Sequence, residues 1–162
     1  MDMANTKFIS LLPFLMMFIF SNLSGVLADR LIGSMGMPVG TARKLLNNSG
    51  FCTAALVLFF LPGVTNQSAG IAGVSIVLGS CAIARGGFAL NHLDVAPTFA
   101  GSVMSLANTA GTIAGIIGVS LTGFLLDASG GESWNAVFGF LAGICLTGAC
   151  VFGLLASGER LF

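Results

Sequence analysis

The chain has very little charge and no tyrosine. Its 162 residues include six Lys and Arg, six Asp and Glu and a single histidine, and the net charge is zero. Charged residues make up 7% of the sequence, whereas a soluble domain carries about 25%. Water cannot solvate a surface so poor in charge, so we expect an integral membrane protein whose main partner is the lipid bilayer. The lack of a basic excess also argues against nucleic acid as a partner.

Signatures of enzymes and of metal sites are missing as well. There is no Gly-x-Ser-x-Gly, His-Glu-x-x-His or P-loop pattern. The four cysteines form no Cys-x-x-Cys pair and lie in apolar runs, where a thiol behaves as a small hydrophobic residue. One histidine with one nearby acid supplies too few ligands for a metal ion. We therefore predict a protein that is not an enzyme and that carries no metal or organic cofactor.

Long apolar runs, separated by charges and turn residues, dominate the sequence. Hydrophobic residues make up 56% of it, and the mean hydropathy is +1.00. A helix needs about 20 apolar residues to cross a bilayer, and in hydrocarbon its backbone groups must bond within the segment. We therefore predict an all-α membrane protein with five transmembrane helices. The predicted spans are roughly 8–28, 44–61, 68–90, 97–125 and 134–156.

The basic residues predict how these spans are oriented. One side of the membrane receives nearly all of them: Arg30, Arg43, Lys44, Arg85 and Arg160. The other side receives only Lys7. Because cytoplasmic loops are rich in Lys and Arg, the first side is predicted to be cytoplasmic. The amino terminus then lies outside, which suggests that the sequence begins partway through a larger membrane protein. A cleaved signal peptide ending at Ala28 is the alternative.

Polar side chains inside the spans are the best functional signal, because each must find a partner or a wet cavity at membrane depth. They gather in the first, third and fourth predicted spans, whereas the second and fifth are largely apolar beyond their ends. This asymmetry predicts that spans one, three and four line a cavity and that spans two and five face lipid. The candidates for the substrate pathway or its gates are Asn22, Arg85, Asn91, His92, Asp94 and Asn108.

Five of the six candidates also have a purely structural explanation. Asn22 and Asn108 can bridge helices, and nearby hydroxyls can bond back to a carbonyl one turn earlier. Arg85 can extend to the cytoplasmic interface. Asp94 has the spacing of a helix N-cap that is followed by proline in the first turn. His92 is either a proton-linked switch or a hydrogen-bonding group at the interface.

Two stretches resemble a known transporter family. The stretch "SGVLADRLI", residues 24–32, resembles the Gly-x-x-x-Asp-Arg loop of major facilitator transporters, with matches at Gly25, Asp29 and Arg30. The stretch "NHLDVAPTFAG…NTAGTIAGIIG", residues 91–118, is more specific. It resembles the anion and sodium-dependent phosphate cotransporter family of that superfamily, and within it the plant anion transporter branch.

The resemblance implies that the five spans correspond to helices 8–12 of a twelve-helix fold, so that the chain is a C-terminal portion and the N-terminal half is its missing partner. It further implies secondary active transport of an anion by alternating access, with inorganic phosphate favoured and a Na⁺ or H⁺ gradient as the driving force. Gly25, Asp29 and Arg30 would form a conformational loop.

Several alternatives stay open beside this interpretation. The anion can be organic, such as glutamate or ascorbate. The chain can also be a truncated module that does not transport and packs against partner helices. A plasma membrane, a chloroplast membrane and a Golgi membrane all fit the sequence.

Overall fold

The computed structural model describes residues 3–128 and 134–159, with side chains described from Leu11 onward. This part of the chain folds into long α-helices joined by short turns and contains no strand. The helices are α1 (Met3–Asp29), α2 (Val39–Phe60), α3 (Gln67–Val95), α4 (Ala100–Ala128) and α5 (Asn135–Leu155). All five are long and apolar enough to cross a membrane. The predicted all-α membrane fold with five spanning helices is therefore confirmed.

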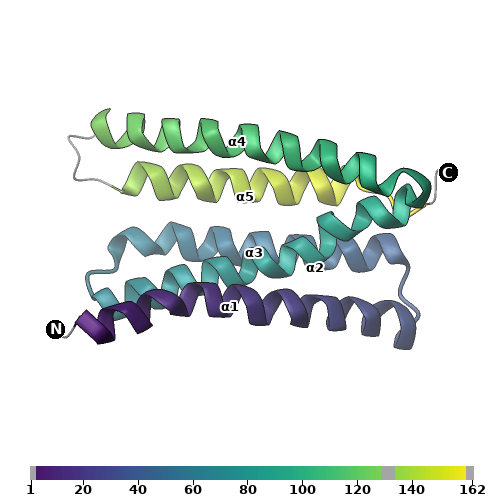
Figure 1. The fold of residues 1–162 in the computed structure, drawn as a ribbon, viewed down its shortest axis with the longest axis horizontal. Helices are drawn as coiled ribbons and strands as arrows, with labels where there is room; N and C mark the ends of the chain where they lie inside the picture. The colour runs from purple at the N-terminus through teal and green to yellow at the C-terminus, as the bar shows by residue number, and fades with distance from the viewer. Residues whose placement is uncertain (1–2, 129–133, 160–162) are drawn as a thin grey trace.

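The five helices run back and forth along one common axis (Figure 1). As a result α1 and α3 end on the side where α2 and α4 begin, and the two termini lie at opposite ends of the bundle. Arg30, Arg43 and Lys44 all lie near the connection from α1 to α2. We call this side of the bundle the basic end. It is the side that the charge pattern predicts to be cytoplasmic.

The connections are short and use turn residues. A π-helical turn, Arg30–Ser34, extends α1, and the chain then turns at Gly36, whose φ of 64° is a left-handed conformation that glycine adopts readily. A 3₁₀ turn, Leu61–Gly63, ends α2. The side chain of Asn66 then caps α3 by accepting a hydrogen bond from the Ser68 amide over 2.9 Å. A second 3₁₀ turn, Pro97–Phe99, separates α3 from α4.

Packing is concentrated on α3 and α2. The helix α3 packs along both α1 and α2, and α5 packs on the other side of α2. By contrast α4 makes only slight contact with α3 and α5, and none of its residues is buried. The buried apolar side chains form two small clusters, one at the basic end and one between α2 and α5.

Glycine allows α2 and α3 to approach closely. A Cβ atom added at Gly50 of α2 would lie 2.6 Å from the amide nitrogen of Ala84 and would collide with the carbonyl oxygen of Ser80. Small residues at a helix interface are the usual route to tight packing in lipid, where dispersion contacts replace the hydrophobic effect as the driving force.

The sequence did not predict how much of the second span packs against other helices, and the prediction that this span faces lipid stays a prediction. Eight residues of α2 are buried, and the helix lies between α3 and α5. Only one side of it, with Leu45, Leu56 and Phe59, is exposed. The reason is that small apolar residues such as Ala42 and Ala54 carry no polar signal in the sequence, yet they pack fully. The polarity of the sequence therefore identified hydrogen-bonding groups but did not predict where helices pack closely.

Enlarging Gly50 tests this interface. We expect Gly50→Ala to lower the free energy of unfolding by about 1–3 kcal/mol, because the added methyl group overpacks the contact between α2 and α3. The measurement is unfolding in detergent micelles, followed by helical circular dichroism. The matched control is Gly115→Ala in α4, where an added Cβ meets nothing within 4 Å. Equal stability of the two variants would contradict the close approach.

Candidate functional site

An ion pair joins α2 to α3 at the basic end of the bundle. Arg43, in the second turn of α2, reaches Asp94 in the last turn of α3, and its Nε donates to Oδ2 over 2.7 Å. Nη1 of the same guanidinium donates to the carbonyl oxygen of Gly86 over 3.0 Å. Arg43 is only 8% exposed. Its charge has thus lost most of its water and depends on these two acceptors.

Two adjacent glycines of α3 make room for this arrangement. A Cβ atom at Gly87 would collide with the carbonyl oxygen of Arg43, and one at Gly86 would collide with the hydroxyl of Ser24 in α1. That hydroxyl donates to the carbonyl oxygen of Ile83 over 2.9 Å, which links α1 to α3 at the same level. Three helices therefore converge on Gly86 and Gly87, about two turns before the end of α3.

The predicted N-cap role of Asp94 is wrong. The helix α3 continues to Val95, so Asp94 lies inside its last turn, and the 3₁₀ turn that follows has no side-chain cap. A charge near apolar surroundings is costly unless it is paired. The ion pair with Arg43 therefore outweighs a capping bond. The sequence offered little warning, because the pattern drew attention to Asp29 and Arg30 rather than to Arg43 in the second turn of the next helix.

Arg85 and His92 share one side of α3. They are seven residues apart, so they lie on the same face of the helix and about 10 Å apart along its axis. The Arg85 side chain is exposed, and among the described residues it forms no ion pair or side-chain hydrogen bond. His92 is half-buried, and its Nδ1 lies 3.2 Å from the carbonyl oxygen of Ala89. A free cation and an imidazole on one face can meet a polar solute.

Two buried amide oxygens among the described residues have no hydrogen-bond donor. The Oδ1 atoms of Asn91 and of Asn47 are buried and accept no hydrogen bond. Asn47 is fully buried, and its Nδ2 donates to the Oδ1 of Asn48 over 3.0 Å. An unsatisfied buried acceptor costs about 1–3 kcal/mol. The predicted candidate Asn91 lies three residues before Asp94 in α3, and so about one turn from the ion pair. Asn47, which the sequence marks only as a polar residue near the start of the second span, lies against Gly87 of α3.

The remaining amide candidates lie elsewhere. Asn22 is exposed on α1, and its Nδ2 donates to the carbonyl oxygen of Phe18 over 2.8 Å. Asn108 is exposed on α4. Hydroxyl side chains around it donate to the carbonyl four residues earlier, so they need no cavity. These hydroxyls are Ser105, Thr109, Thr112, Ser120 and Thr122.

The motif Gly25, Asp29 and Arg30 lies in helical backbone rather than in a loop. Gly25 and Asp29 belong to α1, and Arg30 begins the π-helical turn. The amide of Met35 donates to the carbonyl oxygen of Arg30 over 3.1 Å, so backbone hydrogen bonding continues past the motif. Continued hydrogen bonding is the favoured state for a segment that leaves hydrocarbon. The side chains of Asp29 and Arg30 are exposed.

The structure therefore brings Asp94, Asn91 and His92 together in the last turns of α3, with Arg85 two turns before them. Asn22 and Asn108 lie on other helices. Among the described residues, no group of three or more His, Cys, Asp or Glu side chains could hold a metal ion. The arrangement offers an ion pair, a free arginine and a histidine near one membrane interface. It is suited to binding and releasing a small charged solute rather than to covalent chemistry.

Comparison with known proteins relates the whole chain to membrane transporters. No model of a protein family matches the sequence. The chain is 44% identical to "Probable anion transporter 6" of Oryza sativa subsp. japonica, over 100% of the chain and 40% of that protein. It is 32% identical to "Ascorbate transporter, chloroplastic" of Arabidopsis thaliana, over 99% of the chain and 29% of that protein. "Sodium-dependent phosphate transport protein 1, chloroplastic" of the same plant is 31% identical, over 99% of the chain and 30% of that protein.

These relatives bear the names of transporters, in agreement with the prediction that the chain is not an enzyme. The chain spans 40% or less of the length of the three relatives named above. It therefore corresponds to a part of such a protein.

A double-mutant cycle tests the ion pair. Arg43→Ala or Asp94→Ala leaves the partner's charge unpaired in the bundle, and we expect each to lower the free energy of unfolding by about 2–3 kcal/mol. This is below the value for a fully buried pair, because the Asp94 side chain is 25% exposed. The double variant should lose much less than the sum of the two. Arg85→Ala, which removes an exposed arginine, is the control. Additive losses would show that the two side chains do not interact.

Proposed function

We propose that the chain, which resembles anion and sodium-dependent phosphate transporters over its whole length, belongs with that family and forms membrane helices of a secondary active transporter of inorganic phosphate. In this proposal the five helices are helices 8–12 of a major facilitator fold. Alternating access, driven by a Na⁺ or H⁺ gradient, moves the anion. The membrane is that of an organelle, as the names of the chloroplastic relatives suggest.

The observation that carries the proposal is the free face of α3. Arg85 is exposed there without an acidic partner among the described residues, and His92 lies on the same side two turns away. A cation within a membrane-spanning helix is expensive unless it meets an anion or water. An inorganic phosphate can accept hydrogen bonds from both groups, because Arg is well suited to phosphate oxygens.

The ion pair supplies a gate in the same proposal. Arg43 and Asp94 clamp α2 to α3 at the basic end, and a clamp that opens and closes can control access from that side. The coupling ion acts by competing for Asp94: a proton or a sodium ion on the carboxylate weakens its attraction for Arg43. The side chains of Asn91 and Asn47 add oxygens at the same interface.

Uptake of labelled phosphate tests the transport proposal. The chain is joined to the part of the rice "Probable anion transporter 6" that it does not cover, and the fusion is reconstituted into lipid vesicles. We expect uptake that depends on an imposed Na⁺ or H⁺ gradient and that unlabelled phosphate inhibits, whereas ascorbate and glutamate do not. Inhibition by ascorbate or glutamate instead would assign an organic anion. Absence of any gradient-driven uptake, with the fusion correctly folded, would favour a module that does not transport.

Variants of the same fusion test the residue roles. Arg85→Gln should lower phosphate uptake at least ten-fold, on the order of the 1.5–3 kcal/mol of a charge-assisted hydrogen bond. Arg85→Lys should retain part of it. Asp94→Asn and His92→Ala should lower gradient-driven uptake while exchange of phosphate across the membrane continues. Lys44→Gln, which removes another cation at the basic end, is the control. Wild-type uptake in all of the first four variants would refute the assignment of the site.

A further inference from the structure

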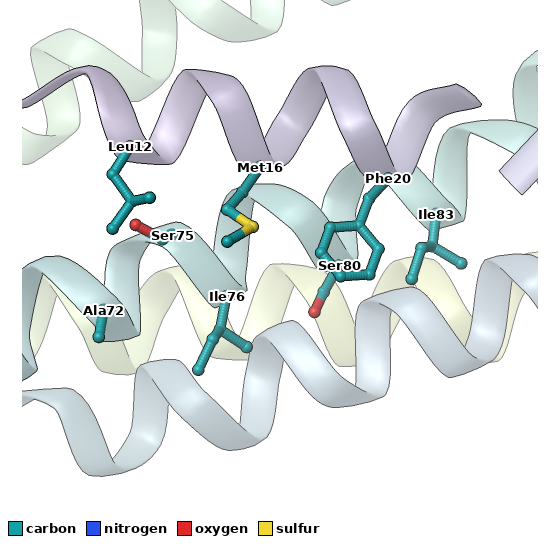
Figure 2. Close-up of a pocket in the computed structure, with 8 residues that line it drawn as sticks. All are labelled: Leu12, Met16, Phe20, Ala72, Ser75, Ile76, Ser80 and Ile83. Carbon is teal, nitrogen blue, oxygen red and sulfur yellow. The ribbon is translucent and has the colours of Figure 1, made fainter. Parts of the chain in front are cut away.

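An apolar groove between α1 and α3 ends at Arg30. Its outer half is a cavity of about 290 Å³, with walls that include Leu12, Met16 and Ile76. Its inner half is a cavity of about 310 Å³, with walls that include Leu27 and Arg30. Phe20 and Ile83 line both halves, so the two cavities adjoin. Figure 2 shows the outer half, where the side chains of α1 point toward α3.

The groove is suited to a hydrocarbon chain and not to the transported anion. Its walls are almost entirely apolar side chains. The hydroxyl of Ser24 donates to the carbonyl oxygen of Ile83 over 2.9 Å, and that of Ser75 donates to the carbonyl oxygen of Ile71 over 2.7 Å. These two hydroxyls are thus engaged by the helix backbone, which leaves that of Ser80 in the walls, and the groove offers no cation except at its end.

Arg30 supplies that cation at the basic end of the bundle. Its side chain is exposed and forms no ion pair among the described residues. Asp29, the nearest acid in sequence, is also exposed, and it lies about 100° around the helix from Arg30. The ten residue steps from Phe20 to Arg30 cover about 15 Å of helix. That is half of the roughly 30 Å hydrocarbon core, the depth that one lipid leaflet reaches.

We propose that this groove binds one anionic phospholipid, with an acyl chain along Phe20, Leu27 and Ile83 and with the phosphate paired to Arg30. Apolar walls and a cation at interface depth match the two parts of such a lipid, and a basic site between membrane helices is a recognised form of lipid recognition. The site goes beyond the transport proposal and does not depend on it, since it lies on the groove and not on the face of Arg85. The bound lipid would brace α1 against α3 beside the turn into α2.

Tryptophan fluorescence tests the site in the complete 162-residue chain. Trp134 is the only tryptophan, so Trp134→Phe removes the native tryptophan fluorescence. Adding Leu27→Trp to that variant then places a single fluorescent reporter in the groove. The chain is reconstituted into phosphatidylcholine bilayers that contain phosphatidylglycerol, and one of the two lipids carries brominated chains as quencher. We expect the reporter to associate with phosphatidylglycerol roughly five-fold more strongly than with phosphatidylcholine, the size expected for one arginine at the membrane surface.

Matched variants separate the groove from the general membrane surface. Arg30→Gln should abolish the preference for phosphatidylglycerol, whereas Arg85→Gln should leave it intact. A reporter at Leu56→Trp, on the exposed side of α2, should show no preference. Equal quenching by the two lipids at Leu27→Trp would overturn the proposal, and so would a preference that survives Arg30→Gln. Protection of the groove reporter from both lipids would also overturn it, because protein would then cover the groove.

A second measurement avoids the reporter altogether. Native mass spectrometry of the unsubstituted chain, released from mixed micelles, counts the lipids that remain bound. One phosphatidylglycerol should be retained by the unsubstituted chain and lost from Arg30→Gln. Equal retention by both proteins would refute the role of Arg30 even if the tryptophan variants fail to fold.

Discussion

The need to neutralise one buried guanidinium organises the basic end of this bundle. Arg43 lies at 8% exposure, where a lone charge would cost several kcal/mol. Its two acceptors, the Asp94 carboxylate and the Gly86 carbonyl oxygen, both belong to α3. The guanidinium can reach them only because Gly87 lets the backbones of α2 and α3 come close. The pairing of the Arg43 charge therefore requires the close packing at Gly87, and together they fix the position of α2 against α3.

The sequence predicted the spans because a transmembrane helix depends on a local feature of the chain. A run of about 20 apolar residues is long enough to cross the bilayer, whatever the rest of the sequence contains. It did not predict the partner of Asp94, because that partner is 51 positions away along the chain. Locally, Asp94 and the proline that follows look like the start of a helix. The ion pair instead carries α3 on to Val95. A capping bond of about 1 kcal/mol is too weak to compete with an unpaired charge in apolar surroundings.

Polar residues in the predicted spans differ in what they indicate about function, because some of them hydrogen-bond to their own helix. Around Asn108 the hydroxyls of α4 bond to their own helix, so their presence says nothing about a cavity. The Arg85 side chain has no such hydrogen bond to its own helix, and no carboxylate among the described residues pairs with it. Among the predicted candidates, the charged and imidazole side chains of α3 therefore carry more weight than the amides and hydroxyls. Asn47, which was not among the predicted site candidates, is nevertheless fully buried.

The helix α3 accordingly presents different surfaces on its different sides. One side contacts α1 and α2 through small residues, and another carries Arg85 and His92. The apolar groove opens between α1 and α3 and meets a cation only at Arg30. In the two proposals a small anion and a lipid pair with different arginines. Ile83 lines the groove and lies about 200° around α3 from Arg85, so a lipid at Arg30 would brace α1 against α3 without competing for the solute proposed at Arg85.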